Sequence, residues 1–166
     1  MRRFAGALLV GALFIAGLSG CTSSDAVGGG PCDVKVTTDT KSKPEITVPS
    51  CDKPKALQVK DIVEGKGDAA KAGDAVTVQY TGVSWSTRKQ FDSSWAPGRR
   101  PFTVQPLGQA AVIQGWNQGL VGAKVGGRRL LVIPASLGYG QQGRMPDIAP
   151  GETLVFVVDV VSINGK

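Results

Sequence analysis

Glycine and proline recur so often in this chain that no long regular element can run through it uninterrupted. The 166 residues include 23 glycines and 10 prolines, and both residue types tend to end helices or to mark turns. Short runs rich in valine, isoleucine and threonine lie between them, and such runs favour strands. A hydrophobic content of 42% is sufficient for one buried core. We therefore expect one globular domain of short strands rather than an all-helical protein.

The first twenty residues have the pattern of a signal peptide. Arg2 and Arg3 form a positively charged start, and the apolar stretch from Phe4 to Gly17 is short for a membrane span and ends in small residues. We therefore assign residues 1–20 to export and exclude them from the fold. An ordinary secretory signal cut nearby and an uncleaved anchor helix are the alternatives.

Leu18-Ser19-Gly20-Cys21 resembles the lipobox of bacterial lipoproteins. The resemblance implies that Cys21 is lipidated and becomes the first residue of the mature chain. Several acyl chains would give stable anchoring. The expected location is therefore the cell membrane, on its extracytoplasmic side.

Two cysteines remain once Cys21 is assigned to lipid. Cys32 and Cys51 form an even pair in an oxidising compartment, so we predict a disulfide between them. Two free thiols or a metal site are the alternatives. The chain has no histidine and the two sulfurs are far apart in sequence, which disfavours a structural zinc site.

Residues 21–54 differ in composition from the rest of the chain. They are rich in serine, threonine, glycine, proline, lysine and aspartate, include Gly28-Gly29-Gly30-Pro31, and show little apolar periodicity. Such a segment buries too little apolar surface to offset its ordering entropy. We predict a flexible tether, with an edge strand at Glu45–Val48 as the less favoured alternative.

The domain should then occupy residues 55–166. Alternating or β-branched stretches predict strands, and a polar loop is expected from Trp85 to Arg100. Val112, Ile113, Trp116 and Leu120 fall at helix spacing, although the glycines among them require packing against a sheet for stability. We predict an α+β fold, a curved antiparallel sheet of about five strands wrapped around one short helix. The expected strands are 57–63, 75–80, 102–104, 128–133 and 153–163.

Five motifs along this domain resemble the FKBP-type peptidyl-prolyl isomerases. They occur in the order typical of the family and span about Leu57 to Ile163: Val78-Gln79-Tyr80-Thr81-Gly82, Phe91-Asp92-Ser93-Ser94, Val112-Ile113-Gln114-Gly115-Trp116, Gly138-Tyr139-Gly140 and Thr153-Leu154-Val155-Phe156. The resemblance implies an FKBP-like fold and catalysis of X–Pro isomerisation without a covalent intermediate or a cofactor.

The resemblance also implies an aromatic pocket whose floor is Trp116. Asp92 matches an acidic residue beside the bound carbonyl, the Tyr139 hydroxyl matches a donor to a ligand carbonyl, and the Ile113 N–H matches a further donor. The implied catalytic residues are Tyr80, Phe91, Asp92, Trp116, Tyr139 and Phe156, and the implied substrate- and macrolide-binding residues are Phe102, Val112, Ile113 and Ile148.

Composition and periodicity alone would give these residues plainer roles. Buried aromatic and aliphatic side chains are usually core, and Asp92 before two serines is typical of a turn. Some positions also depart from the family pattern. Val104 stands where a second phenylalanine is common, Leu137 replaces a frequent aromatic, and Arg144-Met145-Pro146-Asp147 replaces a common His-Pro-Gly loop.

We therefore predict a prolyl isomerase that acts on exported proteins from a membrane-anchored position. Proline-containing exported polypeptides are its expected partners, with macrolides such as tacrolimus or rapamycin as possible ligands, and a monomer is expected. The altered loop leaves a catalytically weak binding module for an envelope partner as the alternative. Without histidine, a P-loop or a recognisable carboxylate pair, hydrolysis is not supported.

Charge gives no reason to expect nucleic acid as a partner. The formal net charge of +6 falls to +4 without Arg2 and Arg3, and no metal site is expected. A mildly basic, solvated surface near anionic lipids or cell-wall polymers accounts for the remaining charge.

Overall fold

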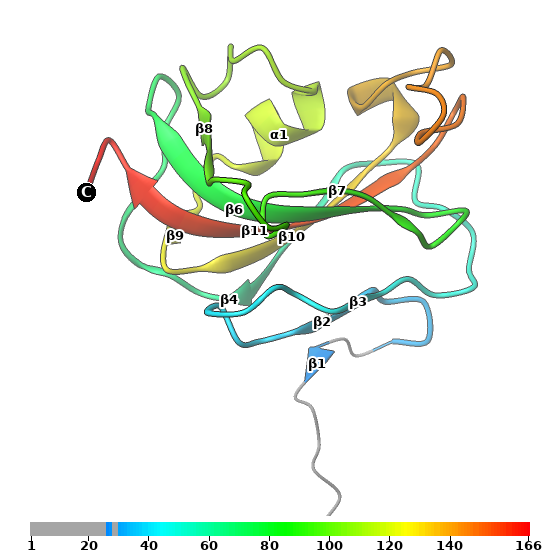
Figure 1. Cartoon of the computed structure of the whole chain (residues 1–166), viewed down its shortest axis with the longest axis horizontal. Helices are drawn as coiled ribbons and strands as arrows, with labels where there is room; N and C mark the ends of the chain where they lie inside the picture. The colour runs from blue at the N-terminus through cyan, green and yellow to red at the C-terminus, as the bar shows by residue number, and fades with distance from the viewer. Residues whose placement is uncertain (1–25, 28–29) are drawn as a thin grey trace, which may run out of the picture.

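One twisted antiparallel sheet organises the molecule. The computed structural model describes residues 26–27 and 30–166. The six strands of the sheet run in the order β4, β10, β11, β6 and β7, with β8 paired to β6 as well (Figure 1). Their bounds are β4 Gln58–Val63, β6 Val76–Ser84, β7 Gln90–Ser93, β8 Phe102–Val104, β10 Arg128–Ile133 and β11 Leu154–Ile163.

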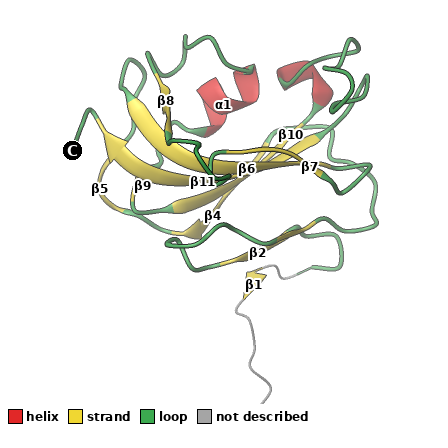
Figure 2. Cartoon of the chain, in the orientation of Figure 1, coloured by secondary structure: helices red, strands yellow, loops and turns green. Residues whose placement is uncertain are grey.

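The remaining elements are short. A six-residue helix, α1 (Gln114–Gly119), and a 3-10 helix, η1 (Ala135–Leu137), lie on one side of the sheet (Figure 2). A two-stranded ribbon joins β5 (Lys66–Ala69) to β9 (Lys124–Val125). A small three-stranded sheet of β1 (Ala26–Val27), β2 (Lys35–Thr37) and β3 (Ile46–Thr47) lies on the other side.

The two faces of the main sheet bury different sets of side chains. Strand side chains alternate between faces, so successive residues of β11 enter different cores: Phe156 and Val158 face α1, whereas Val155 and Val157 face away from it. The helix side is completed by Trp116, among others. Burial of both faces explains why β11 reads as a nearly continuous apolar run rather than an alternating one.

Residues 30–54, which we call the N-terminal arm, cover the face opposite α1. Val34, Val36 and Val48 of the arm are buried against the sheet. The prediction of a flexible tether over 21–54 is therefore wrong for this described part of it. The composition is polar, but three valines of the arm lie where they can pack on an apolar sheet face. The less favoured strand at Glu45–Val48 forms as β3, although it joins the small sheet rather than the edge of the main one.

A buried ion pair also attaches the arm. The guanidinium of Arg128 is fully buried and donates to both carboxylate oxygens of Asp159, at 2.6 and 2.9 Å. Its other hydrogen bonds go to the main-chain oxygens of Thr37 (2.8 Å) and Ser42 (2.7 Å) in the arm. One side chain thus joins β10, β11 and the arm.

Cys32 and Cys51, the two cysteines paired in the sequence analysis, are joined by a disulfide that closes the arm. Cys21 and the signal segment 1–20 lie outside the described residues, so the lipid and export assignments remain predictions. Within residues 26–27 and 30–166, no helix is both long and apolar enough to cross a membrane.

The α+β fold is confirmed, with one difference in the expected loop. Residues 90–93, placed in a loop between Trp85 and Arg100, form β7 and pair with β6. This short strand brings Phe91 and Asp92 alongside Gly82. The predicted helix is present but is limited to the single turn and a half of α1.

Candidate functional site

Five aromatic side chains from five separate elements meet between the sheet and α1. Trp116 of α1 is at the centre, and its ring centroid lies 5.1 Å from that of Tyr80, 5.2 Å from Phe156 and 6.1 Å from Phe102. Phe91 of β7 packs edge-on against Phe156 at 5.4 Å. Near-perpendicular ring pairs at these distances are favourable aromatic contacts. We call these residues the aromatic cluster; Tyr80 lies on β6, Phe102 on β8 and Phe156 on β11.

Glycine at position 82 makes room for two of these rings. A Cβ atom there would lie 2.6 Å from Phe91 Cζ and 2.8 Å from Phe156 Cε1. Any larger residue would have to displace one of the rings. The glycine of the Tyr80-Thr81-Gly82 motif therefore shapes the cluster directly.

The side chain of Trp116 is held by packing and makes no hydrogen bond to the described residues. Its side chain is 4% exposed, and its indole N–H is buried with no hydrogen-bond partner among the described residues. By contrast, Phe102 is 42% exposed. The cluster thus has a buried base at Trp116 and an accessible side at Phe102.

A polar network borders the cluster at Asp92. The Tyr80 hydroxyl donates to Asp92 Oδ2 at 2.7 Å, and Arg99 donates to Asp92 Oδ1 at 2.7 Å. Burial, together with the adjacent carboxylate, raises the pKa of Tyr80 to about 12. The phenol therefore stays neutral and fixes the orientation of the carboxylate.

The start of α1 supplies a main-chain donor. Ile113 precedes the helix in an extended conformation, and its carbonyl accepts from the Trp116 N–H at 3.0 Å. Among the described residues, the Ile113 N–H has no hydrogen-bond acceptor. The side chains of Ile113 and Val112 are partly buried against the same core as the cluster. Free main-chain donors of this kind suit a ligand carbonyl.

The loop between β10 and β11, residues 134–153, brings the last two predicted residues to the same core. We call it the site loop. Ile148 is buried in this core and Tyr139 packs against it. Arg144 exchanges two main-chain hydrogen bonds with Ile148, at 2.7 and 2.9 Å, and its guanidinium carbon lies 6.0 Å from the centre of the Tyr139 ring. The loop thus adds a phenol and a cation beside the aromatic rings.

The structure therefore places all ten of the predicted catalytic and binding residues around one core on the helix side. The disulfide lies apart from them, in the arm on the opposite face, and Cys21 is outside the described residues. Arg99 was not among the predicted site residues, yet it is ion-paired with Asp92. The only signal was its separation of seven residues from Asp92 across a turn.

The arrangement favours binding and reorientation over bond cleavage. Aromatic walls and a few oriented donors can hold an apolar ring and its flanking carbonyls. In the described part of the chain, no group of three or more histidine, cysteine, aspartate or glutamate side chains is placed to hold a metal ion.

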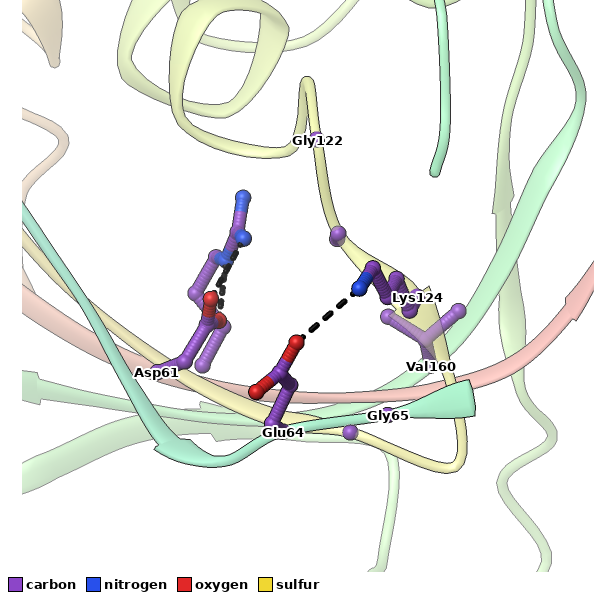
Figure 3. A pocket seen from close by; sticks show the side chains of 9 residues that line it. Asp61, Glu64, Gly65, Gly122, Lys124 and Val160 are labelled. Carbon is purple, nitrogen blue, oxygen red and sulfur yellow. Dashed lines mark hydrogen bonds and ion pairs between the residues drawn. The ribbon is translucent and has the colours of Figure 1, made fainter. Parts of the chain in front are cut away.

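A separate polar crevice near α1 has a structural role. Figure 3 shows its ion pairs, and in one of them Lys124 donates to Glu64 at 2.9 Å. Arg129, paired with Asp61 at 2.7 Å, donates to the carbonyls of Gly119 (3.0 Å) and Val121 (2.8 Å). Arg129 therefore caps the C-terminal end of α1 and helps to hold Trp116 in place.

The sequence matches a known family of proteins over more than half of its length. The sequence model of the family described as "FKBP-type peptidyl-prolyl cis-trans isomerase" matches residues 66–161. An FK506-binding protein of Streptomyces anulatus is 52% identical over 122 residues, which cover 73% of this chain and 97% of the relative. A probable FK506-binding protein of Corynebacterium glutamicum is 43% identical over 121 residues, 72% of this chain and 98% of the relative.

A solved structure shares the fold. The crystal structure of FkpA from Escherichia coli superposes with a TM-score of 0.57 at 35% sequence identity. The match covers 77% of this chain but only 51% of the FkpA chain. The likeness thus extends over about half of that longer protein.

Proposed function

Because this chain belongs to the FKBP-type peptidyl-prolyl cis-trans isomerase family, we propose that it isomerises X–Pro bonds in exported polypeptides at the aromatic cluster. The proline ring binds against Trp116, and the substrate chain leaves past Phe102. The Ile113 N–H and the Tyr139 hydroxyl donate to the carbonyls that flank the proline. Asp92 borders the reacting amide.

The reaction requires rotation and no bond cleavage. Resonance in the amide gives a barrier of about 18–20 kcal/mol, and free X–Pro bonds isomerise in tens to hundreds of seconds. The twisted amide has lost this resonance and carries less charge separation than the planar one. Apolar aromatic walls therefore favour the twisted amide over the planar ground state. The fixed donors hold the carbonyls on either side of the proline.

The observation that best supports this proposal is the position of Trp116. Its ring is packed by three other aromatic rings, and its N–H has no partner among the described residues. The face of an indole ring is apolar, so Trp116 suits a proline ring better than a polar substrate.

Peptide isomerisation tests the proposal. The purified full chain in detergent should accelerate the cis-to-trans change of Leu-Pro and Phe-Pro peptides, and FK506 or rapamycin should abolish the acceleration. A folded protein that binds the macrolide without accelerating isomerisation would instead be the binding module. A folded protein that does neither would refute the proposed site.

We further propose that Cys21 anchors the enzyme to the outer surface of the cell membrane. The support is the sequence pattern before Cys21 and the described arm, which begins only a few residues later. In cells labelled with a palmitate analogue, the wild-type chain should be labelled and sediment with membranes. The Cys21→Ala variant should carry no label, and labelling of that variant would contradict the assignment.

A further inference from the structure

The N-terminal arm lies outside residues 66–161, the part of the chain that matches the family. The 122 residues matched by the Streptomyces anulatus relative must include the end of the arm, but neither match assigns the arm a role. Its main body packs on the sheet face opposite the aromatic cluster, where a purely structural function would be sufficient. Its last residues, however, extend to the base of the site loop.

Two side chains connect the end of the arm to that base. Lys53 Nζ donates to the carbonyl oxygen of Gly151 at 2.8 Å. The Trp85 indole N–H donates to the carbonyl of Cys51 at 3.1 Å, while its main-chain N–H donates to the carbonyl of Thr153 at 3.0 Å. Trp85 is 7% exposed, so it is an internal link between the arm and the site loop.

The path from Gly151 to Tyr139 is short. The Gly151 N–H donates to the carbonyl of Gly140 at 2.9 Å, and Gly140 directly follows Tyr139. The Gly143 N–H donates to the Tyr139 carbonyl at 3.1 Å. Lys53 therefore bonds to Gly151, and the N–H of Gly151 in turn holds the residue that directly follows Tyr139.

The arm can hold Lys53 in place because it is itself fixed at several points. Cys51, two residues before Lys53, is bonded to Cys32. Arg128 holds the carbonyls of Thr37 and Ser42. A donor presented on a fixed segment loses less entropy when it bonds than one on a free chain.

We propose that Lys53 is a positioning residue for the isomerase site, and that the disulfide-closed arm uses it to hold the site loop, with Tyr139, against the aromatic cluster. Catalysis and ligand binding therefore depend on a segment that lies outside the part of the chain matched by the family model. The activity part of this proposal rests on the proposed function, but the loop contact does not.

The test compares three lysine variants of the full chain. Lys53→Met removes the donor, Lys53→Arg keeps a cationic donor, and Lys55→Met removes an equal charge two residues away; both lysines are exposed. For each variant, kcat and KM for a Leu-Pro peptide, the Kd for FK506 and the amide exchange rates of Gly140, Gly143 and Gly151 are measured below the melting temperature.

We expect Lys53→Met to raise KM and the FK506 Kd about fivefold with little change in kcat, as the loss of one hydrogen bond from the binding loop would do. The three glycine amides should exchange faster. Lys53→Arg should restore most of the affinity, and Lys55→Met should match the wild type. The double variant Cys32→Ser/Cys51→Ser should also bind FK506 more weakly. Its three glycine amides should exchange faster, as in Lys53→Met.

Equal values for Lys53→Met and Lys55→Met would overturn the proposal. A Lys53→Met variant that has a lower melting temperature but unchanged KM, Kd and amide exchange rates would also overturn it. The arm would then have a structural role only. If the wild-type chain neither isomerises peptides nor binds FK506, the proposed function fails. The exchange rates of the glycine amides then decide the positioning role by themselves.

Discussion

The hydroxyl of Tyr80 on β6 donates to Asp92 on β7 at 2.7 Å, so an otherwise buried phenol is held against a carboxylate beside the aromatic cluster. Burial and this contact together raise the pKa of Tyr80 to about 12, from an ordinary value of 10.0. The raised pKa of Tyr80 can be measured by titration.

An alkaline titration should show one phenol that ionises only near pH 12. The unfolded chain loses the Tyr80 proton near pH 10, whereas the folded chain keeps it, so the stabilising effect is complete below pH 10 and is lost as the pH rises towards 12. Absorbance at 295 nm measures the ionisation. Tyr80→Phe should remove this late phase, and Asp92→Asn should move it to lower pH. A late phase that survives in Tyr80→Phe would assign it to another group.

Replacing Trp116 tests the base of the cluster. Trp116→Leu keeps an apolar side chain but removes the aromatic surface, so kcat/KM for a Leu-Pro peptide should fall at least tenfold. The free energy of unfolding should fall by about 1–3 kcal/mol. Trp95→Phe is the matched control, because Trp95 lies outside the aromatic cluster. Unchanged turnover in a folded Trp116→Leu protein would contradict the proposed site.

A single methyl group at position 82 should disturb the same cluster. Gly82→Ala places a Cβ within 3 Å of Phe91 and Phe156, which should cost about 1–3 kcal/mol of stability and lower the affinity for FK506. Gly30→Ala serves as control, since its nearest neighbour would be at an ordinary 3.7 Å. Urea unfolding and ligand titration measure the two effects. If Gly82→Ala matched Gly30→Ala in both, position 82 would not shape the cluster.

Breaking the ion pair beneath the arm should destabilise the whole domain. Arg128→Met leaves the carboxylate of Asp159 and the carbonyls of Thr37 and Ser42 without their donor, so we expect a loss of about 3–5 kcal/mol in urea unfolding. Arg99→Met, which removes a guanidinium that is half exposed, should cost far less. Combining Arg128→Met with Asp159→Leu should recover part of the loss, because it removes the unpaired buried charge. A loss in Arg128→Met no larger than that in Arg99→Met would show that the buried pair contributes little.

Much of the fold and site was predictable where pattern and motif coincide. The strand at 128–133 has the predicted bounds, and the aromatic residues of the five motifs gather in space as the family resemblance implies. β7 was missed because Gln90–Ser93 is only four residues long within a polar stretch. Its pairing depends on β6, which no local pattern reveals.

The arm was missed for a different reason. Its composition is that of a linker, and the information that it folds lies elsewhere in the chain. Apolar residues run through β10 and β11 without alternation, which is typical of strands buried on both faces. One short helix covers only one of those faces, so the sequence contained a signal that a second layer was needed. The prediction of a flexible tether followed the polar composition of residues 21–54 and did not use this signal.

The two-sided burial of the sheet has a consequence for how the protein can be handled. A fragment that began where the family match begins, at residue 66, would expose Val83, Leu130, Val132, Val155 and Val157 together. A contiguous apolar surface of this kind promotes self-association. In the full chain the arm and β4, which such a fragment would both lack, keep this surface covered.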